Sequence, residues 1–143
     1  MTTHHVAGSA PTTSVRGEVW VGVACVAGGV VLGALWALVG AAVVGATDPD
    51  EQAAASDGTF ALLGIGFGLV SALLLAVLPG HRQVVRAGVA LAGSVLGGFV
   101  GLAVGLVLGA PALRADGMVL AWPVVLGAVT TLRLLVVHLL GRE

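Results

Sequence analysis

Side chains that could do chemistry are sparse in this 143-residue sequence, which contains four histidines and a single cysteine. His81 and His138 have no nearby acid or cysteine that would complete a metal site. The sequence contains no Ser/His/Asp or Cys/His arrangement. GIGFGLVS, at 64–71, looks superficially like a dinucleotide-binding loop but lies inside an apolar span and lacks the preceding strand. We therefore predict no enzyme and neither a metal nor a cofactor site.

The composition indicates a membrane protein. Hydrophobic residues make up 58% of the chain and charged residues only 9%, and the mean hydropathy is +1.11. A soluble domain carries about 25% charged residues, because water must wet its surface. With a net charge of −1 and no dense basic patch, the chain is also not expected to bind nucleic acid.

Four apolar stretches are long enough to cross a hydrocarbon core of about 30 Å as helices. We place them at about 19–46, 59–78, 84–110 and 118–140. The first is too long for the h-region of a cleaved signal peptide, so we expect it to be retained. The sequence thus predicts an all-α four-helix membrane domain over 18–143, preceded by a disordered cytoplasmic segment at 1–17.

Arginine placement predicts the orientation. The segment between the first two spans carries acidic residues and no arginine, whereas Arg114 and Asp116 cancel between the last two. By the positive-inside rule, both termini and the connection between the second and third spans lie in the cytoplasm. We therefore expect a multi-pass protein of the plasma membrane. The arginines on the cytoplasmic side are Arg16, Arg82, Arg86, Arg133 and Arg142.

Three of these arginines are candidates for contact with lipid. Arg133 lies about 22 Å along the fourth span from Met118, so its guanidinium can reach the cytoplasmic face by snorkelling. The alternative is that it pairs with another group or with an anionic lipid. Arg82 and Arg86 are four residues apart and could face one phosphate-rich surface, although two such charges are also the ordinary topology signal.

A candidate interaction site at the outer rim comprises Asp57, Arg114, Asp116 and Trp122. Ser56 or Asp57 is expected to cap the second helix with a side-chain oxygen. Pro123 suits the first turns of the fourth helix, where a missing amide costs little. Trp122 and Trp20 are expected at opposite membrane interfaces.

Glycines recur at every fourth position between residues 93 and 109. Each costs a helix up to about 1 kcal/mol relative to alanine, but small residues let helices in lipid approach closely. The expected packing residues are Gly93, Gly97, Gly101 and Gly105 in the third span, Gly29 and Gly33 in the first, and Gly64 and Gly68 in the second. The row suits packing inside one bundle, a homodimer seam, or a glycine-lined path. Gly109, at the membrane edge, is expected to tolerate substitution.

Three stretches carry a resemblance to a known family: GALW at 33–36, DGTFALLGIGFG at 57–68 and LAWP at 120–123. With the glycine-rich third span, they resemble an actinobacterial family of small four-span membrane proteins, the domain of unknown function 2567, over roughly residues 30–140. The resemblance implies the same fold in an actinobacterial plasma membrane and supplies no catalytic residue. Relatives tend to have a longer first external loop than this chain.

We therefore predict a non-enzymatic membrane protein that serves as an accessory or assembly subunit of an envelope complex. The lipid bilayer is its expected partner, together with a second copy of the chain or another membrane protein. The alternative is a small transporter or channel component, as a single chain or a homodimer, whose glycine-rich helices line a path. Such a path needs a polar stripe, and the helical faces of this chain show almost none.

Overall fold

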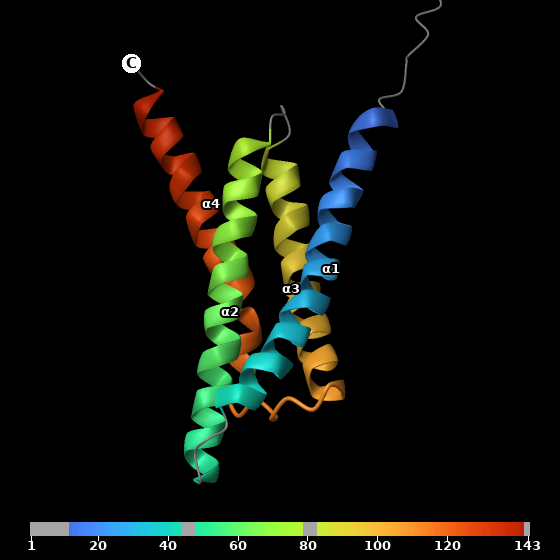
Figure 1. The fold of residues 1–143 in the computed structure, drawn as a ribbon. Coiled ribbons are helices and arrows are strands. Elements are labelled where there is room, and N and C mark those ends of the chain that lie inside the picture. The colour runs from blue at the N-terminus through green and yellow to red at the C-terminus, as the bar shows by residue number, and fades with distance from the viewer. Residues whose placement is uncertain (1–11, 44–47, 79–82, 142–143) are drawn as a thin grey trace, which may run out of the picture.

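The computed structural model describes residues 12–43, 48–78 and 83–141 of the chain. Within these ranges the chain forms four long helices, with a short 3-10 helix before the last (Figure 1). The elements are α1 (Thr12–Val43), α2 (Pro49–Val77), α3 (Gln83–Val107), η1 (Asp116–Leu120) and α4 (Ala121–Leu140). The four α-helices are long and apolar enough to cross a membrane. The prediction of an all-helical chain with four such helices is confirmed.

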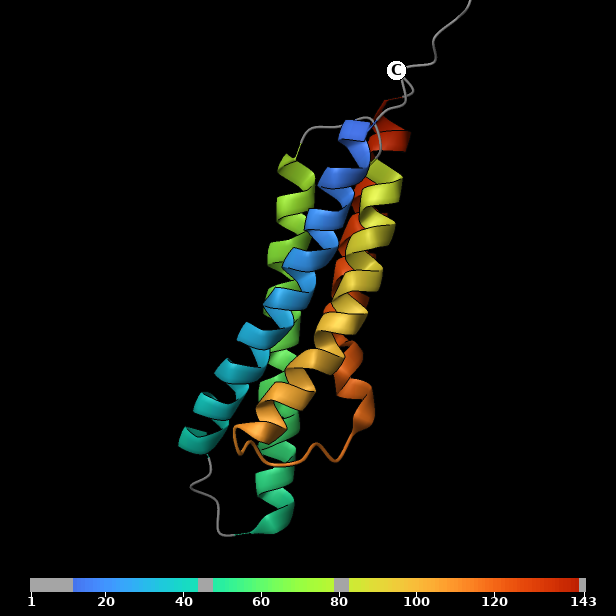
Figure 2. The same cartoon turned by 90° about the vertical axis from the view of Figure 1, so that its right-hand side faces the viewer.

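The helices run up and down, so the bundle has two different ends (Figures 1 and 2). The terminal end holds the start of α1, the end of α2, the start of α3 and the end of α4. The loop end holds the end of α1, the start of α2 and the connection from α3 to α4. Toward the terminal end α4 diverges from α2, whereas the two helices lie together nearer the loop end.

Two helices begin earlier than the apolar stretches predict. α2 begins at Pro49, where Asp48 accepts a hydrogen bond from the backbone N–H of Asp50 at 2.9 Å. The prediction that Ser56 or Asp57 caps α2 is therefore wrong, because a better cap and a proline in the first turn precede them. α1 begins at Thr12, so residues 12–17 are helical rather than disordered. Residues 1–11 lie outside the described part.

α1 and α3 approach each other through glycine. A Cβ added to Gly29 would lie 2.7 Å from the carbonyl carbon of Gly97, and one added to Gly101 would lie 2.9 Å from the carbonyl oxygen of Gly29. Real Cβ atoms essentially never come closer than 3.0 Å to such atoms. Gly33 also faces the Gly101 backbone. Within one chain, α1 therefore covers the glycine row of α3.

Two tryptophans fill the space that the glycines leave. Trp36 of α1 is fully buried, and its Cζ3 would lie 2.6 Å from a Cβ at Gly105. Trp122 of α4 is 2% exposed, with its ring against Gly28 and Gly97. Trp122 is therefore not an exposed anchor that faces lipid, because these glycines open a pocket for its indole inside the bundle. Trp20, by contrast, is 66% exposed.

α2 and α4 also meet at small residues. A Cβ at Gly64 would lie 3.2 Å from the Cβ of Ala121, and a Cβ at Gly68 would lie 2.8 Å from the Cβ of Val125. Phe67 of α2 packs edge-on against Trp122, with ring centroids 5.3 Å apart. The first half of α4 is therefore held by α2.

Gly109 follows the end of α3 with a φ of 90°. The N–H groups of Gly109 and Ala110 donate to the carbonyls of Leu106 and Gly105, a glycine-dependent helix ending. A Cβ at Gly109 would meet nothing within 4 Å. The prediction that Gly109 tolerates substitution is nevertheless wrong, because an L side chain strains the backbone at this φ.

We expect Gly97→Leu to lower the stability of the purified chain by about 1–3 kcal/mol or more, through overpacking. Gly97→Ala should also destabilise it, because the added Cβ would lie 2.6 Å from the Cys25 carbonyl oxygen. Thermal unfolding in detergent measures both. The matched control is Gly88, also in α3, where an added Cβ meets nothing within 4 Å. If Gly97→Leu unfolded at the same temperature as Gly88→Leu, this account of the row would be wrong.

Candidate functional site

At the loop end, a buried carboxyl group of α2 holds the connection between α3 and α4. Asp57 is 8% exposed, and its two oxygens accept hydrogen bonds from the backbone N–H groups of Arg114 and Ala115, at 2.9 and 3.0 Å. Burying a carboxyl group is costly unless such bonds replace its water. Asp57 therefore fixes the backbone of this connection against α2.

The side chain of Arg114 makes a separate and weaker contact. Its Nη1 pairs with Asp50 of α2, and the two side chains are 66% and 77% exposed. Exposed ion pairs of this kind contribute about 0–1 kcal/mol. Two members of the predicted outer-rim site, Asp57 and Arg114, are thus joined through the Arg114 backbone rather than through its guanidinium.

A second set of hydrogen bonds at the loop end links α1, α2 and the connection between α3 and α4. The indole Nε1 of Trp36 donates to Ser56 Oγ at 3.3 Å, and this hydroxyl donates to the carbonyl oxygen of Pro111 at 3.3 Å. Phe60 of α2 packs edge-on against Trp36, with ring centroids 4.9 Å apart. Sequence reasoning missed the joining of Trp36 and Ser56, although both lie in or next to the GALW and DGTF stretches.

The other two members of the predicted outer-rim site do not join Asp57. Asp116 is exposed at the start of η1. Trp122 is buried between the helices, where its Nε1 donates to Ser71 Oγ at 3.2 Å. The four predicted residues therefore do not form one surface. At the loop end, the described side chains anchor a backbone segment.

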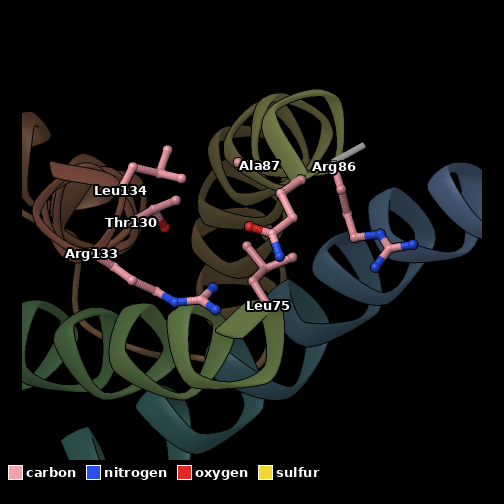
Figure 3. Close-up of a pocket in the computed structure, with 7 residues that line it drawn as sticks. Leu75, Arg86, Ala87, Thr130, Arg133 and Leu134 are labelled. Atoms are coloured by element: carbon pink, nitrogen blue, oxygen red, sulfur yellow. The ribbon is translucent and has the colours of Figure 1, made fainter. Parts of the chain in front are cut away.

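At the terminal end, Arg133 of α4 bonds to α2. Its Nη2 donates to the carbonyl oxygen of Ala76 at 3.0 Å, and Figure 3 shows the Arg133 side chain extending from α4 toward α2. The last carbonyls of a helix have no partner within that helix and carry a partial negative charge. α2 has no basic residue in its own last turn. Arg133 therefore supplies the cation that the end of α2 lacks.

A small cleft of about 20 Å³ lies beside Arg133, between the end of α2, the start of α3 and α4. Gln83, Arg86 and Thr130 contribute to its lining, and Figure 3 shows Arg86 directed toward α1. The predicted lipid-contact residue Arg82 lies outside the described residues, as does His81. In the described part of the chain, no three His, Cys, Asp or Glu side chains gather as metal ligands would.

We expect Asp57→Ala to destabilise the chain by about 1–3 kcal/mol, because two backbone N–H groups lose their acceptor. Asp50→Ala removes an exposed ion pair in the same region and should cost less than about 1 kcal/mol. Thermal unfolding in detergent compares them. Equal losses in the two variants would contradict the role assigned to Asp57.

No protein-family model, curated protein or solved structure matches the chain. The site must therefore be interpreted from its own geometry. Hydrogen bonds from the buried side chains of Ser56 and Asp57 fix the loop end. The terminal end has a cleft beside Arg133, next to the part of α4 that diverges from α2.

Proposed function

We propose that this chain is a non-enzymatic protein of the plasma membrane and serves as an accessory or assembly subunit of an envelope complex. The observation that carries the proposal is the divergence of α4. Its first half is packed, with Leu126 only 1% exposed, but Leu135 and Leu139 are 53% and 59% exposed. The last turns of α4 therefore leave the bundle and offer an apolar surface to another membrane protein (Figure 1).

The geometry of the loop end supports a scaffold role. Asp57 and Ser56 hold the α3–α4 connection by hydrogen bonds to its backbone. The glycine contacts between α1 and α3 add a tightly packed core. A rigid bundle with one splayed helix is suited to presenting that helix to a partner.

Polar side chains within the spans favour a subunit over a transporter or channel. Ser71 is bonded to the indole of Trp122, and Ser94 donates to the carbonyl of Leu91 at 2.8 Å. A conduction path needs polar groups that remain available along the membrane. The resemblance to the four-span actinobacterial family belongs to the same proposal.

The proposed orientation places both termini in the cytoplasm and the loop end outside. Single cysteines at Ala54 and Ala112, both exposed at the loop end, should react with an impermeant thiol reagent added to intact cells. A cysteine at Gln83, exposed at the terminal end, should react only after the cells are opened. The reverse pattern would overturn the orientation. Cys25 is buried and is replaced by alanine throughout.

The subunit role is tested by a photo-crosslinking amino acid placed at Leu135 or Leu139 in the native host. These side chains lie four residues apart on the splayed part of α4, so both should yield the same discrete adduct with a different membrane protein. Leu62, which is 70% exposed on α2, is the control and should yield none. An adduct with a second copy of the chain would instead favour the homodimeric alternative. Absence of a protein adduct at both α4 positions would overturn the proposal.

A further inference from the structure

The cleft at the terminal end is lined by the cationic side chain of Arg133. Its seven lining residues include no acidic residue, and the second arginine among them, Arg86, is directed toward α1 (Figure 3). The first turn of α3, which contributes Gln83 to the cleft, has no acidic residue, and helix N-termini carry a partial positive charge. The charge of Arg133 and the partial positive charge at the start of α3 thus add at this place, so the cleft favours an anion.

Arg133 still has N–H donors with which it can bind an anion. A guanidinium has five N–H donors, and the bond to the Ala76 carbonyl engages Nη2. The hydroxyl of Thr130 and the amide of Gln83 also line the cleft. Its volume of about 20 Å³ admits a water-sized group, so an oxygen of a phosphate can enter while the phosphate itself stays at the mouth.

A larger apolar cavity adjoins the cleft. It has a volume of about 250 Å³ and shares Leu75 with the cleft. Its walls come from the spans and include Val21, Phe67 and Leu74. Hydrocarbon is the favourable occupant of such a space at membrane depth, because the walls offer water almost no hydrogen bonds.

We propose that these adjoining spaces bind one anionic phospholipid from the leaflet at the terminal end. The phosphate lies at the mouth of the cleft, where Arg133, Gln83 and Thr130 contact it. One acyl chain passes Leu75 into the apolar cavity. Basic pockets between membrane helices bind lipid headgroups in this way. The proposal goes beyond the subunit role and requires only that the chain spans a membrane, so either can fail without the other.

The test uses the purified full chain, stripped of lipid in a neutral detergent. Phosphatidylglycerol and phosphatidylcholine with identical acyl chains are titrated, and bound lipid is counted by native mass spectrometry alongside the unfolding temperature. We expect phosphatidylglycerol to bind at least about tenfold more tightly and to raise the unfolding temperature. Equal binding of the two lipids would overturn the proposal.

The headgroup contact is tested with Arg133→Gln, which should weaken phosphatidylglycerol binding about tenfold, the loss of one strong charge-assisted contact. Arg16→Gln is the matched control, because it removes one exposed arginine from the same end and should leave binding unchanged. If both variants weakened phosphatidylglycerol binding equally, the lipid would be attracted to the positive surface in general, and the proposed site would be wrong. If Arg133→Gln does not fold, Thr130→Val and Gln83→Ala replace it, and unchanged binding in both would be equally decisive.

The chain contact is tested with Ala24→Phe, which fills the apolar cavity. Ala27→Phe is the control on the same helix, because Ala27 lines a different groove against α3. Only Ala24→Phe should weaken phosphatidylglycerol binding. Inorganic phosphate at the same concentration should not raise the unfolding temperature. Stabilisation by phosphate alone, with Ala24→Phe binding lipid normally, would show an anion site and overturn the lipid assignment.

Discussion

The packing of this bundle depends on the close approach of α1 and α3 at glycine. Helices in lipid gain little from covering apolar surface, because lipid is equally apolar, so they associate where backbones can come near enough for dense dispersion contacts. Gly29 and Gly97 provide that distance. Gly97, together with Gly28 on α1, also leaves room for the Trp122 ring. The position of α4 therefore follows from the spacing between two other helices.

Hydrogen bonds then fix the relative positions of the helices that the glycines allow to approach. Trp122 reaches Ser71, and Trp36 reaches Ser56. Each indole N–H is thereby satisfied away from water, where an unpaired donor would be costly. These bonds form only at one position of α1 and α4 along the axis of α2. They therefore select a single register, whereas glycine contacts alone would allow the helices to shift along one another.

The sequence predicts those parts of the fold that depend on local composition. Four spans follow from apolar length, and Pro123 falls in the first turn of α4 as expected. Apolarity does not locate helix ends, and the cap formed by Asp48 and Pro49 was the signal that would have placed the start of α2 correctly. The roles of Asp57 and Trp122 could not be read from spacing, because their partners lie 57 and 51 residues away along the chain. Spacing also does not say whether the glycine row meets its own chain or another copy.

The two ends of the bundle differ in how they are held, and this difference bears on where a partner can act. At the loop end, the bonds of Asp57 and Ser56 bind the α3–α4 connection to α2. At the terminal end, Arg133 reaches across a widening gap to one carbonyl of α2. A ligand that binds beside Arg133 therefore meets the part of α4 that has left the bundle. Its binding energy acts on the orientation of that helix, while the loop end keeps its shape.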